Sequence, residues 1–369
     1  MVINEEDGIQ RSGIRGRLGE LCYRSGLLRV LQRTRTWARP DLRILAYHRV
    51  LTVPDANAFD FDLDLVSTSA AGFREQMLLL KRRFRPIGLA EVVATLDAGR
   101  RLPANSVAVT FDDGYDDNYR IAYPVLRELG IPATFFVSTA HIDTGRPFAY
   151  DWLVHMILAS TLQRLVLPEL GMDLPMPARR NERRNLASHV LRMMKDTEVA
   201  NQSAMIARLE QEWRMPHEAG HPDCRPMNWD QLREMHAAGF EIGSHGVRHR
   251  MLAKLPQQQL EGELLDSKAT IERELNAPAR LLSYPVGGDL AFDERVMAAT
   301  RAAGYLAACS YICGTNPRSV PNRYALYRLP VERVMGTGWF AAMLTLPELM
   351  GYPTMSRVDT VAPDRTCSS

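Results

Sequence analysis

The sequence predicts a single parallel α/β barrel, and three observations support this fold class. Short apolar segments alternate with amphipathic segments along most of the 369 residues, as expected for strands and helices that follow one another in a parallel sheet. The segments 106–111 and 133–137 are compact and apolar, and the helical segment between them stops at Gly130, a common helix terminator. Polar residues follow directly after several of these strands, where barrels place their functional loops.

The same alternation predicts the remaining elements in order along the chain. Strands are expected at 43–48, 85–88, 106–111, 133–137, 240–243, 280–284, 305–308 and 328–331. Besides the helix that ends at Gly130, helices are expected at 71–83, 89–96, 229–239, 256–275 and 292–303. The chain has no internal repeat of solenoid length, so the elements belong to one barrel and not to a repeat array.

The charge and hydrophobic pattern of the sequence divides the chain into three parts. Residues 1–43 form a basic N-terminal extension, 44–335 the barrel and 336–369 a C-terminal tail. The alternation is interrupted at about 141–226, a helix-rich stretch with a run of charged residues at 179–184. We interpret this stretch as an insertion on the barrel, and the charged run as the solvated face of a helix.

The basic extension has two interpretations. Residues 11–43 carry nine arginines against two acidic residues, and their apolar residues have roughly helical spacing. Four glycines weaken the prediction of a helix here. The segment is either an amphipathic helix that rests on an anionic membrane surface or an N-terminal helical extension that packs on the barrel or is loosely ordered, and we favour the second interpretation. The apolar residues are Ile14, Leu18, Leu21, Leu28 and Leu31.

Composition excludes some classes of protein. The formal net charge of +2 gives no support for nucleic-acid binding, and no apolar run reaches the roughly 20 residues that cross a bilayer. The first ten residues are acidic and polar, unlike a secretory signal. Five cysteines without a regular framework suggest reduced thiols. We therefore expect a cytoplasmic protein, with the inner face of the membrane as the alternative location.

Two adjacent carboxylates follow the strand predicted at 106–111. Asp112 and Asp113 would repel each other and would be costly to bury without a partner. A bound cation removes that cost, because one carboxylate can ligate it while the other serves as a base, and Gly114 permits a tight turn. The alternative is an acidic turn that caps the next helix. This motif alone does not separate the two interpretations.

Two histidines follow the strand predicted at 240–243. His245 and His249 are four residues apart, which predicts two imidazoles on one face of a helical turn at the aspartate end of the barrel. That spacing suits chelation of one metal ion, whereas the alternative is a hydrogen-bonded structural histidine. Two histidines and one aspartate favour zinc and also accept cobalt, manganese or nickel.

The two motifs resemble those of the polysaccharide deacetylase superfamily, the NodB homology or carbohydrate esterase family 4 group. TFDDGY at 110–115 resembles its first motif and SHGVRH at 244–249 its second, while LAYHRV at 45–50 resembles a common opening strand. The resemblance covers about 44–335 apart from the insertion. It implies a distorted (β/α)7 barrel and the removal of N-acetyl groups from GlcNAc-type sugars.

The resemblance also implies roles for individual residues. Asp112 would be the catalytic base, taking a proton from a water whose pKa a divalent metal lowers. A backbone N–H near Val286 would help the metal to hold the oxyanion. The expected metal ligands are Asp113, His245 and His249. The expected substrate-binding residues are Tyr115, Tyr284, Pro285 and Val286.

Two later motifs depart from the family pattern. Ser283 stands where many members have the arginine that orients the base, and Val286 where they have an aromatic residue. The C-terminal motif with the general-acid histidine is absent, and the segment 327–330 occupies about its place. We therefore expect an inner site without its usual arginine and acid. His48, which ends the first strand, is our substitute for the acid, with a structural hydrogen bond as the alternative.

The departures leave the substrate open. A polysaccharide or a lipid-linked glycan precursor is the favoured substrate, and a small acylated sugar is an alternative. A barrel that binds glycan without turnover, as a scaffold in polysaccharide assembly, is a second class of function. Asp112 argues against the scaffold, because binding alone requires no base. Peripheral membrane contact through the basic N-terminus would suit a lipid-linked substrate.

Overall fold

Seven parallel strands close into a barrel in the computed structural model, which describes residues 13–38, 41–194, 199–217 and 220–352. Strand β1 pairs with β5 on one side and β13 on the other, so the sheet has no open edge between them. In order around the barrel, the strands are β1 (Asp41–Tyr47), β5 (Ser106–Phe111), β6 (Ala133–Val137), β9 (Glu241–Ser244), β10 (Leu281–Ser283), β11 (Ala307–Cys313) and β13 (Leu326–Pro330). The predicted barrel is confirmed.

Short strands supplement the barrel. Strand β4 (Arg85–Pro86) runs parallel to β5, and β12 (Asn316–Pro317) runs antiparallel to the start of β1. Beside the end of β1, β2 (Arg49–Val50) pairs with β3 (Val66–Thr68). The register shift between β11 and β13 makes the barrel irregular on that side.

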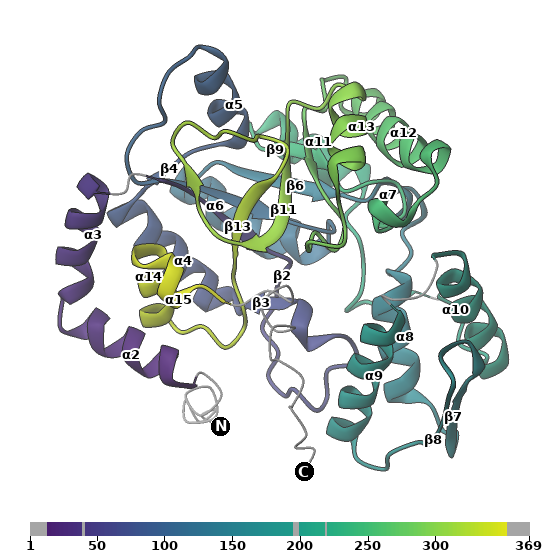
Figure 1. The fold of residues 1–369 in the computed structure, drawn as a ribbon. Helices are drawn as coiled ribbons and strands as arrows, with labels where there is room; N and C mark the ends of the chain where they lie inside the picture. Colours follow the sequence, from purple (N-terminus) through teal and green to yellow (C-terminus); the bar gives the residue numbers. More distant parts are fainter. Residues whose placement is uncertain (1–12, 39–40, 195–198, 218–219, 353–369) are drawn as a thin grey trace, which may run out of the picture.

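Helices cover the outside of the barrel and connect its strands (Figure 1). Side chains cap the N-termini of several of these helices. Ser69 caps the helix that begins at Ala70, Asp293 caps the helix that begins at Glu294, and Asn228 and Gln231 form a capping box at the helix that begins at Trp229. Gly130 ends α6 with a φ of 64°. The helices are α4 (Ala70–Arg83), α5 (Leu89–Asp97), α6 (Tyr123–Leu129), α11 (Trp229–Ala237), α12 (Gln257–Leu275) and α13 (Glu294–Ala302).

Alternation along β5 decides which side chains point into the barrel. Val107, Val109 and Phe111 belong to the hydrophobic cluster shared with helices α4 and α6. Ala108 belongs to the cluster formed by residues of the other barrel strands. Because side chains alternate along a strand, Thr110 and then Asp112 also face the interior. The strand therefore directs Asp112 to the top of the barrel axis.

The expected insertion is helix-rich but also contains a β-hairpin that the sequence did not predict. Residues 139–213 form α7 (Thr139–Thr144), α8 (Ala149–Ala159), β7 (Arg164–Leu167), β8 (Met172–Pro175), α9 (Arg180–Met194) and α10 (Val199–Trp213). From α8 onward these elements lie to one side of the barrel in Figure 1. They share a hydrophobic cluster with Phe61 of the loop after β2 and with Val66 of β3.

The charged run on α9 is not simply a solvated face, contrary to the sequence prediction. Arg183 donates to the backbone oxygen of Ser160 at 2.5 Å, and Arg184 donates to that of Phe59 at 2.6 Å. These guanidinium groups bind backbone carbonyls at the C-terminal end of α8 and in the loop after β2. The run therefore joins the insertion to the loop after β2.

Helices at the two ends of the described chain pack on each other. The extension forms α2 (Gly13–Arg24) and α3 (Leu27–Ala38), and the expected tail begins with α14 (Thr337–Thr345) and α15 (Pro347–Met350). Residues 338–345 are all buried, because α14 lies between the N-terminal helices and α4. The expected tail therefore contributes to the core. In the described ranges, no helix has both the length and the hydropathy to cross a membrane.

Candidate active site

The C-terminal ends of four barrel strands bring the predicted site residues together. Asp112 and Asp113 follow β5 directly, and His245 follows β9. The backbone N–H of Asp112 donates to the carbonyl oxygen of Tyr47 at the end of β1. The backbone N–H of His245 donates to the carbonyl oxygen of Val137 at the end of β6. Each motif is thus attached to the neighbouring strand, which fixes its height along the barrel axis.

Asp113, His245 and His249 form a compact triad. The Oδ1 atom of Asp113 lies 3.4 Å from Nε2 of His245 and 3.2 Å from Nε2 of His249. One ligand atom from each residue lies within 4.8 Å of the others, and this is the single such cluster of His, Cys, Asp or Glu in the described part of the chain. The three residues predicted as metal ligands therefore share one site.

The backbone of the triad is unusual. Asp113 has a φ of 73° and His249 a φ of 54°, in the left-handed region that non-glycine residues seldom adopt. Gly114 follows with a φ of 86°, and a Cβ there would lie 2.9 Å from Val137. Such conformations cost free energy and persist where the surrounding structure imposes them, often at functional sites. Here the turn directs Asp113 toward the two histidines.

The histidine motif is a turn and not the helical turn that its spacing predicted. Gly246 has a φ of 74°, which takes the chain out of the helical region. The buried carboxylate of Glu263 on α12 accepts hydrogen bonds from the backbone N–H groups of Val247 and Arg248, at 2.6 Å and 3.0 Å. Glu263 therefore replaces the helical hydrogen bonds and brings His249 back toward His245.

His245 has a defined tautomer. Its Nδ1 lies 2.7 Å from the carbonyl oxygen of Ser283, which can only accept, so Nδ1 carries the proton and Nε2 presents a lone pair to the triad. Burial lowers the pKa of His245, but the charges of Asp112 and Asp113 outweigh it and raise the pKa above its usual value. The carbonyl of Ser283 therefore orients the imidazole through Nδ1, and the negative charges of Asp112 and Asp113 attract it.

Asp113 presents an oxygen suited to a cation. Burial tends to raise its pKa, but contacts with the two histidines hold the pKa well below its usual value. Its Oδ1 is buried and accepts no hydrogen bond from the described residues. Ligands at bond lengths of about 2.1 Å in tetrahedral geometry lie about 3.4 Å apart, close to the separations in this triad. The donor set and its spacing therefore fit a divalent metal ion.

Arg328 of β13 binds Asp112 with both of its terminal nitrogens. Nη1 donates to Oδ1 at 2.8 Å and Nη2 to Oδ2 at 2.6 Å, and both side chains are almost fully buried. Burial tends to raise the pKa of Asp112, but the positive charge of Arg328 lowers it below the usual value. Asp112 is therefore ionised near neutral pH and fixed in orientation.

The arginine expected to be missing is thus supplied by another strand. Nε of Arg328 donates to the carbonyl oxygen of Ser310 at 2.6 Å, Nη1 to Thr110 at 3.2 Å, and Nη2 to the hydroxyl of Ser283 at 3.0 Å. Ser283 stands at the position where the family pattern has the arginine, and its short side chain both leaves room for Arg328 and binds it. The predicted catalytic base therefore has an arginine partner after all.

A family model described as "Polysaccharide deacetylase" matches residues 99–166 and 173–308, which is more than half of the chain. The chain belongs to the polysaccharide deacetylase family. The matched ranges include both motifs of the triad but end before Arg328. Sequence similarity to the family therefore gives no direct information about this arginine.

Two curated relatives illustrate the similarity. The putative polysaccharide deacetylase YxkH of Bacillus subtilis (strain 168) is 24% identical over 238 residues, which are 64% of this chain and 56% of that protein. The poly-beta-1,6-N-acetyl-D-glucosamine N-deacetylase of Escherichia coli (strain K12) is 30% identical over 109 residues, 29% of this chain and 15% of that protein. The chain thus spans about half, or less, of the length of these relatives.

Solved structures share the fold. The Streptococcus pyogenes deacetylase PplD in complex with acetate superposes with a TM-score of 0.54 at 18% identity, covering 85% of this chain and all of that one, 100%. IcaB from Ammonifex degensii superposes with a TM-score of 0.51 at 19% identity, covering 83% of this chain and 97% of that one. These similarities establish the barrel of the family.

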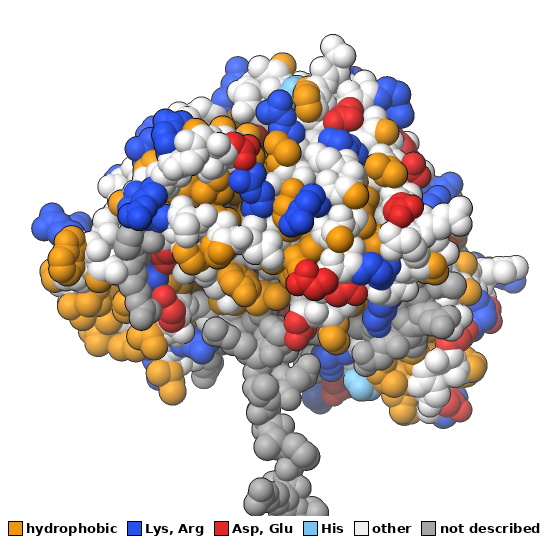
Figure 2. Space-filling view, turned by 45° about the horizontal axis from the view of Figure 1, so that its top comes forward, with side chains coloured by type: hydrophobic (Ala, Val, Ile, Leu, Met, Phe, Trp, Pro, Cys, Tyr) orange, Lys and Arg blue, Asp and Glu red, His pale blue; other side chains and the backbone are white. Residues whose placement is uncertain are grey.

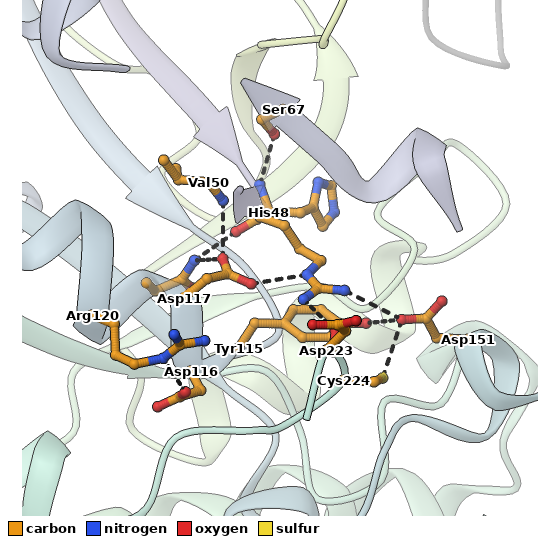
Figure 3. A network of polar contacts seen from close by, with 12 residues as sticks. His48, Val50, Ser67, Tyr115, Asp116, Asp117, Arg120, Asp151, Asp223 and Cys224 are labelled. Atoms are coloured by element: carbon orange, nitrogen blue, oxygen red, sulfur yellow. Dashed lines mark hydrogen bonds and ion pairs between the residues drawn. The ribbon is translucent and has the colours of Figure 1, made fainter. Parts of the chain in front are cut away.

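His48, predicted as a general acid, lies close to Asp112 and Asp113, whose charges act on it. Burial lowers its pKa, while the charges of Asp113 and Asp112 act in the opposite direction. Its ring centroid lies 5.2 Å from that of Tyr311. In Figure 3 the interactions drawn at His48 involve its backbone N–H and carbonyl oxygen, and its imidazole lies outside the network. The structural hydrogen bonds are therefore made by the backbone of His48.

Two of the four predicted substrate-binding residues are buried. Tyr115 is 1% exposed, and its hydroxyl donates to Asp151 at 3.2 Å. Tyr284 is fully buried and its hydroxyl donates to the carbonyl oxygen of Tyr324 at 2.9 Å. Each hydroxyl is therefore bound inside the protein, and a substrate-binding role for Tyr115 and Tyr284 stays a prediction.

The neighbouring turn keeps its predicted form. Pro285 is buried, whereas Val286 is half-exposed with a φ of 64°, and Gly287 follows with a φ of 63°. The carbonyl oxygen of Gly287 accepts from the backbone N–H of Tyr311 at 2.6 Å, so the turn is fixed against β11. A role of the Val286 backbone in binding an oxyanion stays a prediction.

A buried polar network below the site supports the strand ends (Figure 3). Asp117 accepts from Nε of Arg49 and from the backbone N–H of Val50, each at 2.9 Å. The guanidinium of Arg49 lies over the ring of Tyr115 at 4.5 Å. Asn118 donates to the carbonyl oxygen of His48 at 2.8 Å. The residues after the first motif therefore hold the end of β1 and its histidine in place.

Tyr311 is a site residue that sequence reasoning missed. It is half-exposed and lies between His48 and the guanidinium of Arg328, which is 5.4 Å from its ring centroid. Although part of the residue is exposed, burial of its phenol group raises the pKa well above the usual value, so the phenol stays protonated. It stands in the long strand β11, of which the sequence predicted only the first part, so no local motif marked it.

Proposed function

We propose that this chain is a metal-dependent hydrolase that removes N-acetyl groups from GlcNAc-type sugars of a glycan. The observation that carries the proposal is the pairing of Asp112 with Arg328 immediately beside the triad. A site that only bound a metal would need the triad but would gain nothing from a buried, ionised second carboxylate, whose desolvation is costly. A base next to a cation site is the arrangement that hydrolysis of an amide requires.

The metal would be held by Asp113, His245 and His249. Zinc is the ion we expect for two imidazoles and one carboxylate, and cobalt, manganese and nickel are compatible with the same donors. A divalent ion at these residues supplies Lewis acidity, which lowers the pKa of water and polarises the carbonyl of the acetamide. Ser283 contributes by fixing the Nδ1 proton of His245, so that Nε2 faces the ion.

Asp112 would accept the proton of the attacking water. Arg328 keeps this carboxylate ionised and prevents its rotation, because it engages both oxygens while leaving further lone pairs available to a proton. Arg328 itself keeps its proton, since its pKa is raised further by the neighbouring Asp112. We therefore assign Asp112 as the catalytic base and Arg328 as a positioning residue.

His48 is our proposed proton donor to the leaving amine. It directly follows β1, as Asp112 directly follows the neighbouring strand β5, and its pKa responds to the charges of both aspartates. Burial lowers that pKa, so the resting imidazole is neutral near pH 7. The proton that Asp112 takes from the attacking water would pass to this imidazole and from there to the leaving amine, which returns both residues to their resting state. The negative charge of Asp113 and Asp112 favours protonation of the imidazole.

The substrate class is inferred from the relatives. The Escherichia coli relative is named for poly-beta-1,6-N-acetyl-D-glucosamine, and the name of a Staphylococcus aureus relative, 32% identical over 105 residues, is the same. We propose a β-linked N-acetylglucosamine polymer or its lipid-linked precursor as the substrate. A cytoplasmic location stays a prediction.

The test is release of acetate from N-acetylated oligosaccharides by the zinc-loaded chain. Asp112→Asn should reduce the rate by roughly 10²–10⁴-fold, the usual contribution of a general base. Asp116→Asn is the matched control, because Asp116 directly follows the same motif but binds Gln231 and Arg120. Metal binding without acetate release from β-1,4- or β-1,6-linked oligosaccharides or a lipid-linked sugar would instead favour a glycan-binding scaffold.

A further inference from the structure

The N-terminal helices α2 and α3 have one face that is fixed against the protein. Gly19 lies so close to α14 that a Cβ would be 2.8 Å from the Cα of Trp339. On α3, Gln32 donates to the carbonyl oxygen of Arg83 at 2.5 Å, and buried Arg35 pairs with Asp41 at 2.6 Å. These contacts fix the orientation of both helices about their axes and therefore determine which side chains face away from the protein.

The outer face is apolar on both helices. Its large side chains recur at helical spacing, three on each helix. They are Ile14 (85% exposed), Leu18 (48%), Leu21 (67%), Leu27 (46%), Val30 (59%) and Trp37 (89%). These six are nearly half of the thirteen exposed large hydrophobic residues in the described part of the chain, although the two helices are a small fraction of it. We call these six residues the apolar stripe.

Positive charge borders the apolar stripe. Figure 2 shows hydrophobic side chains gathered at the left margin, where α2 and α3 lie, with Lys and Arg side chains beside them. Within the described residues 13–38, the single acidic residue is Glu20, which pairs with Arg24 at 2.7 Å. The exposed arginines are Arg15, Arg17, Arg24, Arg29 and Arg33.

We propose that the apolar stripe docks this protein on an anionic lipid bilayer, with the two helices lying in the membrane surface. Apolar side chains, a tryptophan and flanking arginines are the composition of helices that lie at the lipid interface. The arginines match the negative charge of lipid headgroups. Packing on the barrel and contact with a membrane are thus made by opposite faces of the same helices.

A second copy of the chain is a poorer occupant of this surface. A two-fold contact through the stripe would bring the exposed arginines of both copies together, with Glu20 as the sole acidic residue of each helix pair to offset them. A lipid surface has no such conflict, because its charge is opposite. The proposal is independent of the proposed catalytic activity, since none of the stripe residues belongs to the triad or to its supporting contacts.

The experiment is sedimentation of the full, metal-loaded chain with vesicles. One set contains phosphatidylcholine with phosphatidylglycerol and the other phosphatidylcholine alone. Wild type should sediment with the anionic vesicles, and less so in high salt because the charge attraction is screened. The triple variant Leu21→Ser, Val30→Ser, Trp37→Ser should lower the vesicle-bound fraction at least about tenfold, since three large apolar side chains are lost.

A matched control separates the stripe from general surface hydrophobicity. Leu162→Ser, Leu265→Ser, Leu290→Ser removes three side chains that are 43%, 50% and 69% exposed elsewhere on the protein, and it should bind vesicles as wild type does. A second triple variant, Arg17→Gln, Arg29→Gln, Arg33→Gln, should lose binding to anionic vesicles and its salt dependence. Acetate release from a soluble oligosaccharide checks that each variant is folded and reports on the catalytic proposal separately.

Three results would overturn the proposal. The first is wild type that stays in the supernatant with anionic vesicles at low salt. The second is a stripe variant that binds the vesicles as tightly as wild type. The third is a wild-type dimer in sedimentation velocity that the stripe substitutions dissociate, which would assign the surface to a second copy of the chain.

Discussion

The buried pair of Asp112 and Arg328 makes a quantitative prediction about stability. Removing one partner of a buried ion pair leaves an uncompensated charge and costs about 3–5 kcal/mol of the free energy of unfolding. Both side chains are essentially buried, at 2% and 0% exposure, so water cannot replace the missing partner. We expect Asp112→Asn and Arg328→Met each to be destabilising by this amount.

The double variant should be less unstable than the sum of the two changes. Removing both charges leaves no unpaired ion, so the coupling free energy should be about 2–3 kcal/mol. Losses of the Arg328 contacts to Ser310, Ser283 and Thr110 occur with or without Asp112 and cancel in the cycle. The coupling therefore reports the ion pair itself.

The assay is urea unfolding of the four proteins, followed by circular dichroism after removal of metal by a chelator. The same cycle at Arg164 and Asp173, an exposed pair of the hairpin with side chains 56% and 61% accessible, is the control and should show little coupling. If the effects of Asp112→Asn and Arg328→Met simply add, the two residues do not act as a buried pair and the proposed positioning of the base is refuted.

Three further substitutions test individual contacts. His48→Ala should lower the deacetylation rate by about 10²-fold if the imidazole donates the proton, and an unchanged rate would remove it from the mechanism. Tyr115→Phe should cost about 1 kcal/mol in urea unfolding, because Asp151 loses one hydrogen bond, without changing KM for an oligosaccharide; a raised KM would support its predicted substrate role. Gly287→Ala should be strongly destabilising, because its Cβ would lie 2.6 Å from the backbone nitrogen of Tyr311 at a φ of 63°; a wild-type unfolding midpoint would contradict this geometry.

Local sequence patterns were sufficient for much of the fold. The strands expected at 106–111 and 133–137 have these bounds as β5 and β6. Both are short apolar runs that are followed directly by a polar residue, Asp112 or Ser138, so the pattern itself marks their ends. The hairpin of β7 and β8 lacked such marks, because each strand has only four residues and β8 has a single buried one, Met172.

The triad could also be predicted from sequence, because its three residues stand in two short motifs at the ends of strands. Arg328 could not be assigned a role in the same way. It is 216 residues from Asp112, and only closure of the barrel brings β13 beside β1 and over the base. A charged residue inside an apolar strand at the open end of a barrel was the available signal, since such a residue requires a buried partner.

Burial was the property that sequence reasoning judged least well. Tyr115 and Tyr284 stand within site motifs, but their rings pack inward. Their hydroxyls donate hydrogen bonds to distant segments, Tyr115 to Asp151 and Tyr284 to the carbonyl oxygen of Tyr324. Similarly, residues 337–345 read as part of a tail until α2 and α4 are seen to cover them. These outcomes depend on which elements meet in three dimensions.

Zinc titration of the metal-free chain tests the central claim most directly, with acetate release from an N-acetylated oligosaccharide as the measurement. We predict no release without metal and a rate that rises in proportion to bound zinc, reaching its limit at one ion per chain, because the described residues offer one cluster of suitable ligands. Full acetate release by the metal-free chain would contradict the assignment of Asp113, His245 and His249. So would a zinc-saturated chain that releases no acetate from any N-acetylated sugar.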